Sequence, residues 1–141
     1  MAFRPRWTRR TPSSRAERPP APNSTRTRGQ CFEALAEAHL VRAGCVVLVR
    51  NHRCRGGEID LIVRDGEVLA FVEVRYRRSR SHGGAAASVD ARKRARIVRA
   101  AGHFLLVQPA HAARRCRFDV VAIDGEGEAR TVAWIAGAFS A

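Results

Sequence analysis

The sequence GGEIDLIVRDGEVLAFVEVR, residues 56–75, decides the fold. Two apolar segments flank Asp65-Gly66, a dipeptide typical of two-residue β-hairpin turns. If Asp65 and Gly66 are the two central turn residues, Arg64 faces Glu67 across the turn. The sequence therefore predicts two antiparallel strands joined by a tight turn.

Acidic side chains gather on one face of this predicted hairpin. Counting outward from the turn, the register pairs Asp60 with Phe71 and Glu58 with Glu73. Because side chains alternate along a strand, these four residues and Arg75 share a face. Asp60 and Glu73 become diagonal neighbours, about 7–8 Å apart at the backbone. Glu58 directly opposite Glu73 is unfavourable unless a cation lies near both carboxylates.

Two interpretations of this acidic face stay open. In the first, the face is exposed to solvent and its charges only keep the protein soluble. In the second, Asp60 and Glu73, with Glu58 beside them, bind a hard divalent cation such as Mg²⁺, which takes oxygen ligands and keeps several waters. We favour the metal site because Ile62 and Phe71 share the face and would partly cover it.

Several ordered motifs resemble the YraN-type family of small bacterial proteins, which are related to the restriction-endonuclease-like (PD-(D/E)xK) nucleases. The resemblance covers about residues 29–139, and it rests on four motifs: GEIDLI from Gly57, FVEVR from Phe71, DARK from Asp90 and RFDVV from Arg117. It implies an αβββαβ sandwich, an α/β fold in which helices flank a mixed central sheet.

The resemblance also implies an active site for a metal-dependent endonuclease. Its pattern is an acid on the first helix, an aspartate on one strand and Glu-x-Lys on the next, which fall here on Glu33, Asp60, Glu73 and Arg75. The implied cofactor is Mg²⁺ or Mn²⁺. Arg75 departs from the pattern, because arginine stays protonated and cannot act as a general base. Lys93, the only lysine of the chain, is a candidate substitute.

The charge of the chain predicts a polyanionic partner. Its 141 residues carry a formal net charge of +13, with an isoelectric point near 11.5. Nucleic acid is the expected partner, with DNA favoured, and junction-type DNA would favour a homodimer. We expect no membrane association, because no long apolar run is present. Without a recognisable signal peptide, the expected location is cytoplasmic.

Two further functions remain open beside the endonuclease. The first is a non-catalytic nucleic-acid-binding protein that keeps a nuclease-like fold. The second is a small partner-binding protein whose charge serves solubility or ribosome association. Cleavage of DNA separates the enzyme from both, and binding at physiological salt separates the nucleic-acid binder from the partner-binding protein.

Composition divides the chain into two parts. Residues 1–28 contain eight arginines, one acid and five prolines, which predicts a disordered basic arm. Such an arm either contacts phosphates non-specifically or is only a solvated tail. Residues 29–141 are expected to form a single nuclease-like domain.

The remaining elements follow from periodicity and from turn residues. We expect a helix over Gln30–Ala43, with Glu33 at the border of its apolar stripe, and a second helix capped by Ser88 and ended before Pro109. Outside the hairpin, the expected strands and connections are a strand over Val46–Arg50, a turn over Asn51–Arg55, a basic loop over Tyr76–Gly84, and strands over Arg117–Ile123 and Thr131–Ile135.

Basic and aromatic residues near the acidic face are the candidate contacts with a sugar-phosphate backbone. The alternative is that they lie on solvated surfaces. The candidates are Arg53, Arg55, Tyr76, Arg77, Arg78, Arg92, Lys93 and Arg96.

Overall fold

The structure is a computed structural model that describes residues 25–79, 84–85 and 89–141. Its elements, in chain order, are α1 (Thr25–Arg42), β1 (Val46–Cys54), β2 (Gly57–Asp65), β3 (Val68–Arg77), α2 (Ala91–Val107), β4 (Arg115–Asp124) and β5 (Thr131–Phe139), with short 3-10 turns at Pro109–His111 and Gly127–Ala129. The strands form one sheet in the order β1-β2-β3-β4-β5. Only the β3–β4 pair is parallel, so the predicted αβββαβ sandwich with a mixed sheet is confirmed.

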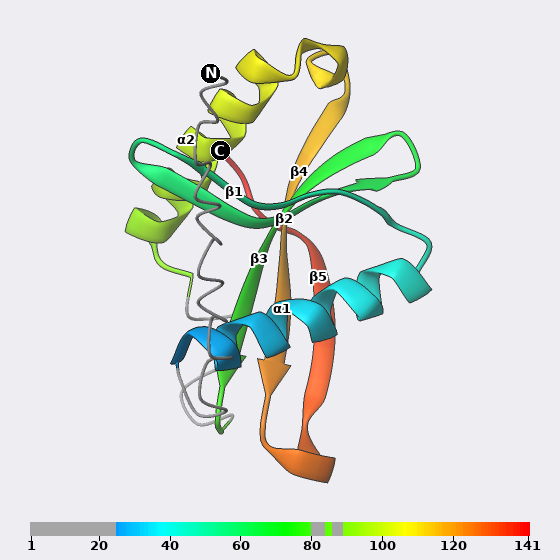
Figure 1. The fold of residues 1–141 in the computed structure, drawn as a ribbon, viewed down its shortest axis with the longest axis vertical. Helices are drawn as coiled ribbons and strands as arrows, with labels where there is room; N and C mark the ends of the chain where they lie inside the picture. The colour runs from blue at the N-terminus through cyan, green and yellow to red at the C-terminus, as the bar shows by residue number, and fades with distance from the viewer. Residues whose placement is uncertain (1–24, 80–83, 86–88) are drawn as a thin grey trace, which may run out of the picture.

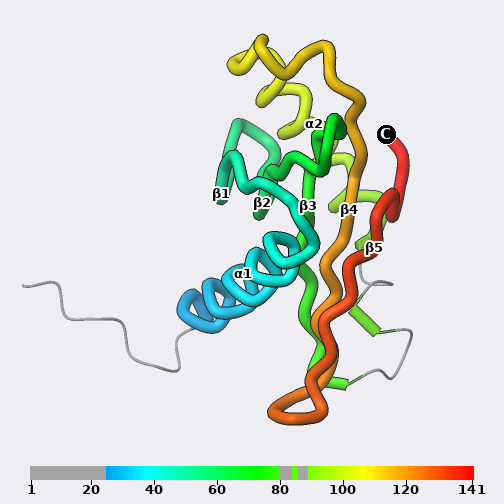
Figure 2. Tube along the Cα trace, turned by 90° about the vertical axis from the view of Figure 1, so that its right-hand side faces the viewer, coloured from blue at the N-terminus to red at the C-terminus, as the bar shows by residue number. Residues whose placement is uncertain are grey.

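The two helices cover opposite faces of the sheet. Helix α2 buries Ile97, Ala100 and Phe104 in one apolar cluster, which also contains Phe71 of β3. Helix α1 buries Ala36 and Leu40 in a second cluster, which includes alternate residues of the same strands. Figure 1 shows α1 crossing in front of the sheet, and Figure 2 shows it standing to one side of the strands. The sheet twists strongly, so that β1 and β2 run across the direction of β3 and β4 (Figure 1).

The central hairpin forms, but its register differs from the prediction by two residues. Asp65 pairs with Val68, so Gly66 and Glu67 are the central turn residues. Gly66 has φ +58°, and a glycine at the first central position is typical of a type II′ turn. Asp65 instead remains in β2, where its carboxylate accepts a hydrogen bond from Arg117 at 3.0 Å. A shift by two keeps every side chain on its predicted face but changes its cross-strand partner.

The first helix begins at Thr25 rather than at the predicted Gln30. Its early turns are held by aromatic contacts, since the Phe32 ring stacks on Tyr76 with centroids 4.0 Å apart and the Arg130 guanidinium lies 5.4 Å from the Phe32 ring. Residues 25–28, predicted to be part of the arm, therefore belong to α1. The rest of the predicted arm lies outside the described residues.

The other element boundaries also extend beyond the predictions. Strand β1 continues to Cys54, so residues 52–54 are paired with β2 rather than turning. The N-cap of α2 is Asp90, whose Oδ1 accepts the Lys93 N–H at 2.8 Å. Ser88, the predicted cap, lies outside the described residues. Pro109 follows the end of α2, as predicted.

Asp119 of β4 is fully buried and anchors β5 to the sheet. Its carboxylate accepts hydrogen bonds from the Arg117 guanidinium at 2.8 and 2.9 Å, the Trp134 indole at 2.9 Å and the Gly137 N–H at 2.9 Å. These partners explain why β5 continues to Phe139, past the predicted end at Ile135. Neither helix in the described residues is long and apolar enough to cross a membrane.

Candidate functional site

Asp60 lies where β2 separates from β3. The last residue pair between these strands is Leu61 with Val72, whereas β2 continues to Gly57 beside β1 alone. The Val74 N–H, past this last pair, donates to Asp60 Oδ2 at 2.8 Å. Continuing the register by one residue places Asp60 opposite Glu73. The predicted pairs of Asp60 with Phe71 and of Glu58 with Glu73 are therefore wrong, because Phe71 pairs with Ile62.

Glu73 is the buried acid of the site. Only 3% of its surface is exposed, and its Oε2 meets no hydrogen-bond donor among the residues that the structure describes. Its side chain is close enough to Asp60 for the two carboxyl groups to share a hydrogen bond when one of them carries a proton. Two acids on the same side of the sheet thus share one partly dehydrated space.

Burial changes the ionisation of both acids. Desolvation, followed by the negative charge of Asp60, raises the pKa of Glu73 to about 8, although Lys93 opposes the shift. Desolvation also raises the pKa of Asp60, against the hydrogen bond from Val74. Near neutral pH the pair therefore retains a proton unless a cation replaces it.

Three cationic side chains surround these carboxylates. The Lys93 ammonium lies 3.3 Å from Glu73 Oε1 and 3.6 Å from Glu58 Oε1. Arg75 approaches Glu73 Oε1 at 3.6 Å, and Arg53 approaches Glu58 Oε2 at 3.9 Å. Lys93, predicted as a nucleic-acid contact, thus also touches two of the predicted metal ligands.

Glu33 reaches the same site from α1. Desolvation raises its pKa, and the charges of Asp60 and Glu58 raise it further, so it lies within electrostatic reach of both. A side-chain hydrogen bond from Asn51 partly offsets this rise. Each of the four acids predicted for the site, on α1, β2 and β3, therefore lies within electrostatic reach of at least one other.

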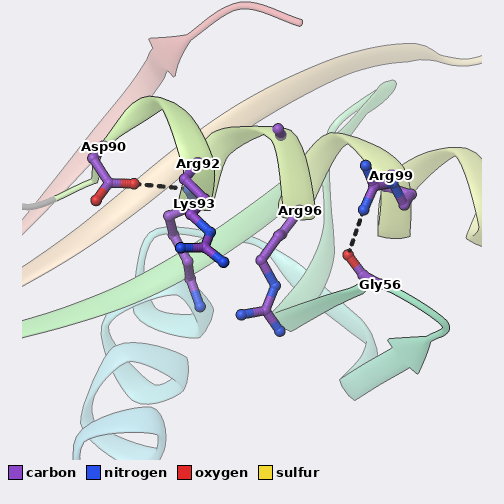
Figure 3. A pocket seen from close by; sticks show the side chains of 7 residues that line it. Gly56, Asp90, Arg92, Lys93, Arg96 and Arg99 are labelled. Carbon is purple, nitrogen blue, oxygen red and sulfur yellow. Dashed lines mark hydrogen bonds between the residues drawn. The ribbon is translucent and has the colours of Figure 1, made fainter.

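Two basic grooves flank the acids. The α2 groove, of about 630 Å³, is lined by Gly56, Asp90, Arg92, Lys93, Arg96 and Arg99 (Figure 3). The α1 groove, of about 500 Å³, is lined by Arg26, Gly29, Gln30, Glu33, Asn51 and Arg53. Lys93 and Arg53 line different grooves and both contact Glu58, so this glutamate lies between them.

The tip of the β1–β2 hairpin is fixed against α2 beside the α2 groove. Arg99 donates to the Gly56 carbonyl oxygen at 3.1 Å (Figure 3). A Cβ atom on Gly57 would lie 2.2 Å from the Arg96 carbonyl oxygen, so only glycine allows this approach.

The remaining predicted contacts lie apart from the carboxylates. The half-buried Tyr76 packs with the α1 cluster, and Phe32 covers one face of its ring. Arg78 pairs with Glu126 at 3.2 Å. Arg55 is exposed in the β1–β2 turn and Arg77 at the end of β3. Tyr76 and Arg77, predicted to begin the basic loop, belong to β3, and residues 80–83 of that loop lie outside the described residues.

Three residues beside the site were not among the predicted site residues. Asn51 has φ +51°, an uncommon conformation that asparagine tolerates better than most residues, and it hydrogen-bonds Glu33. Arg99 belongs to the same helical stripe as Arg92 and Arg96, which was the signal for its place in the groove. Arg26 had been assigned to the arm, and only the longer α1 places it beside the α1 groove.

The donor atoms of the site fit a hydrated hard cation. Among the described residues, no three His, Cys, Asp or Glu side chains lie close enough together to hold a metal ion as a group. Mg²⁺ usually retains several waters and needs only one or two protein carboxylates. Asp60 and Glu73 supply two, and the buried Glu73 Oε2 still lacks a partner among the described residues.

Comparison with other proteins places this site inside a family region. Residues 32–123 match the model of the uncharacterised protein family UPF0102. A UPF0102 protein of Xanthomonas campestris pv. campestris is 51% identical over 118 residues, which cover 84% of this chain and 95% of that protein. A UPF0102 protein of Aeromonas hydrophila is 51% identical over 117 residues, covering 82% and 87% of the two chains.

A third relative, from Stutzerimonas stutzeri, is 46% identical over 117 residues, covering 83% of this chain and 98% of the relative. The region that matches the family model contains Glu33, Asp60, Glu73 and Lys93. This chain therefore belongs to the uncharacterised protein family UPF0102, which is the YraN-type family whose motifs it carries.

Proposed function

We propose that this protein is a Mg²⁺- or Mn²⁺-dependent endonuclease-like hydrolase of nucleic-acid phosphodiesters, with DNA the favoured substrate. One observation carries the proposal: Asp60 and Glu73 lie side by side in a partly dehydrated space, and Glu73 Oε2 finds no donor among the described residues. Such an oxygen pair favours a cation more strongly than solvent-exposed carboxylates do.

Each acid has a separate role in this proposal. Asp60 and Glu73 would hold the metal ion, and Glu58 and Glu33 would complete or orient its surroundings. The Val74 N–H donates to Asp60 Oδ2 and so orients the carboxylate. Asp60 Oδ1 would then be the oxygen that binds the metal ion. When bound, the ion would polarise the scissile phosphate and lower the pKa of an attacking water.

The basic residues would position the substrate. Arg75 stays protonated, so it would stabilise negative charge that develops on the phosphate and would not accept a proton. The α2 groove brings Arg92 and Arg96 next to Lys93, and the α1 groove brings Arg53 close to Glu58. A nucleic-acid backbone that follows both grooves would pass the carboxylates.

Purified protein incubated with Mg²⁺ or Mn²⁺ and with duplex, single-stranded and branched DNA, or with RNA, tests the proposal. We expect metal-dependent cleavage of at least one substrate. Asp60→Asn and Glu73→Gln should abolish it, whereas the matched control Glu67→Gln, at an exposed acid of the β2–β3 turn, should cleave normally. Equal cleavage by wild type and Asp60→Asn would contradict the proposal that this site performs the cleavage.

A second candidate function is nucleic-acid binding without turnover. It is favoured by Arg75, which stands where the related nucleases carry lysine. In that case the protein would bind DNA equally well with and without divalent metal, and it would cleave none of the substrates.

A further inference from the structure

Lys93 is in an unusual place for a cation. It lies in the first turn of α2, three residues after the Asp90 cap, where the positive end of the helix dipole disfavours an ammonium group. Its ammonium nevertheless points to Glu73 and Glu58, at 3.3 and 3.6 Å. The carboxylates, rather than the helix, therefore hold Lys93 in position.

The position of Lys93 conflicts with metal binding. Lys93 and Arg75 already contact Glu73 Oε1, so a divalent ion at Glu73 would add positive charge close to two cations. Like charges in a partly dehydrated site repel strongly. A metal ion would thus bind more readily after the ammonium group has moved away.

The α2 groove offers a destination for Lys93. Its side chain is 23% exposed, and it lines this groove beside Arg92 and Arg96 (Figure 3). A phosphate bound between these residues would attract the ammonium group. Lysine suits such a transfer, because its charge is compact and its stem is flexible, whereas arginine forms a planar fork.

We propose that Lys93 is a displaceable internal counter-ion, which leaves Glu58 and Glu73 for a backbone phosphate and so makes metal binding and nucleic-acid binding reinforce each other. This inference rests on the proposed function and adds its regulation. Without nucleic acid, the protein would bind the metal ion weakly. The metal ion would bind more tightly once nucleic acid occupies the α2 groove. By linkage, metal would then strengthen nucleic-acid binding by the same factor.

Calorimetric titration of Mn²⁺ tests the coupling. We would titrate wild type, Lys93→Met and Arg42→Met, each alone and with a short DNA duplex whose integrity is checked on a gel, and subtract a titration of the duplex alone. Arg42→Met is the matched control, because it removes one positive charge at an exposed position at the end of α1, outside both grooves and away from the carboxylates.

In wild type and in Arg42→Met, DNA should tighten Mn²⁺ binding roughly tenfold, within the usual range of coupling. Lys93→Met should bind Mn²⁺ about tenfold more tightly than wild type without DNA, and DNA should add little. Equal or weaker binding by Lys93→Met without DNA overturns the inference but leaves the metal site intact. If neither wild type nor Lys93→Met binds Mn²⁺ under any condition, the inference and the proposed function both fail.

A direct readout follows from the sequence, since Lys93 is the only lysine. Labelling with ¹⁵N-lysine gives a single side-chain ammonium signal. We expect this signal to shift when DNA is added, and again when a divalent ion follows. An ammonium signal that stays unchanged while DNA binds would overturn the displacement.

Discussion

The Val74 N–H donates to Asp60 Oδ2 at 2.8 Å, beyond the last residue pair of β2 and β3. A side chain thus takes the place of a strand as the acceptor, just beyond the point where the two strands separate. This contact explains how an acid remains at a fixed position where the sheet opens. It also lets the structural and chemical roles of Asp60 be separated by substitution.

Asp60→Asn and Asp60→Ala should differ in stability but not in metal binding. Asparagine keeps an oxygen that accepts the Val74 N–H, whereas alanine leaves that N–H without its acceptor. We expect Asp60→Ala to be less stable than Asp60→Asn by about 1–3 kcal/mol in urea titrations. Both variants should lose Mn²⁺ affinity in calorimetry. If Asp60→Asn bound Mn²⁺ as tightly as wild type, Asp60 would not be a metal ligand.

Metal binding should depend steeply on pH. Burial and the charge of Asp60 raise the pKa of Glu73 to about 8, so an ion that binds this carboxylate must displace a proton. Below about pH 8, Mn²⁺ affinity should therefore rise by roughly tenfold for each pH unit. Calorimetry in buffers of different ionisation enthalpy should record about one proton released per ion. A flat affinity between about pH 6 and 8 would mean that the pair is already ionised.

Removing the Glu73 charge should stabilise the fold at alkaline pH. A carboxyl group with a higher pKa in the folded than in the unfolded protein supports stability below its unfolded value of 4.5, and this stability is lost as pH rises through about 8. Glu73→Gln should therefore gain about 1–3 kcal/mol over wild type at about pH 9, with a smaller difference at about pH 6. Urea titrations at both pH values measure the free energy of unfolding of the two proteins.

The exposed acid Glu67 is the control for that comparison, because its substitution by glutamine should give the same small effect at both pH values. If Glu73→Gln were less stable than wild type at alkaline pH, the ion pairs of Glu73 with Lys93 and Arg75 would outweigh its desolvation.

Asp119 should matter for folding but not for metal binding. It is completely buried, and Asp119→Ala would leave the Trp134 indole and the Gly137 N–H without their acceptor. We expect a loss of about 3–5 kcal/mol, the usual cost of breaking a buried ion pair. Asp65→Ala, which removes the more exposed partner of Arg117, should cost only about 0–1 kcal/mol. Similar losses for both variants would contradict a special role for the buried carboxylate.

The fold was predictable because its pattern is local. Apolar alternation on both sides of the turn predicts β2 and β3 whichever two residues occupy the turn. The exact register was not predictable, because Asp65-Gly66 and Gly66-Glu67 are both acceptable turns. The contact of Asp65 with Arg117, which lies on a distant strand, favours the second. Such long-range contacts leave no trace in a short stretch of sequence.

The acids of the site, and Lys93 and Arg75 as its neighbouring cations, were predictable, but the ion pairs between them were not. Period-two alternation places Asp60 and Glu73 on one face in either register, so the two-residue shift did not change the prediction that they share a face. The approach of Lys93 depends on how α2 packs on the sheet, and the close contact of Gly57 with the Arg96 carbonyl sets that packing. Arg26, which lines the α1 groove beside Glu33, likewise belongs to a helical turn that composition assigned to the arm.

The two grooves should contribute separately to nucleic-acid binding. If a backbone crosses the carboxylates, removing cations from either groove should reduce the number of phosphates neutralised. For the pairs Arg92→Ala/Arg96→Ala and Arg26→Ala/Arg53→Ala, we expect the slope of log affinity against log salt to fall by about 0.7–0.9 per lost phosphate contact. Fluorescence anisotropy with labelled DNA at several salt concentrations measures the slope. Arg42→Ala, an exposed arginine at the end of α1 and outside both grooves, should leave it unchanged. If only the α2 pair changed the slope, the nucleic acid would contact the α2 groove and not the α1 groove.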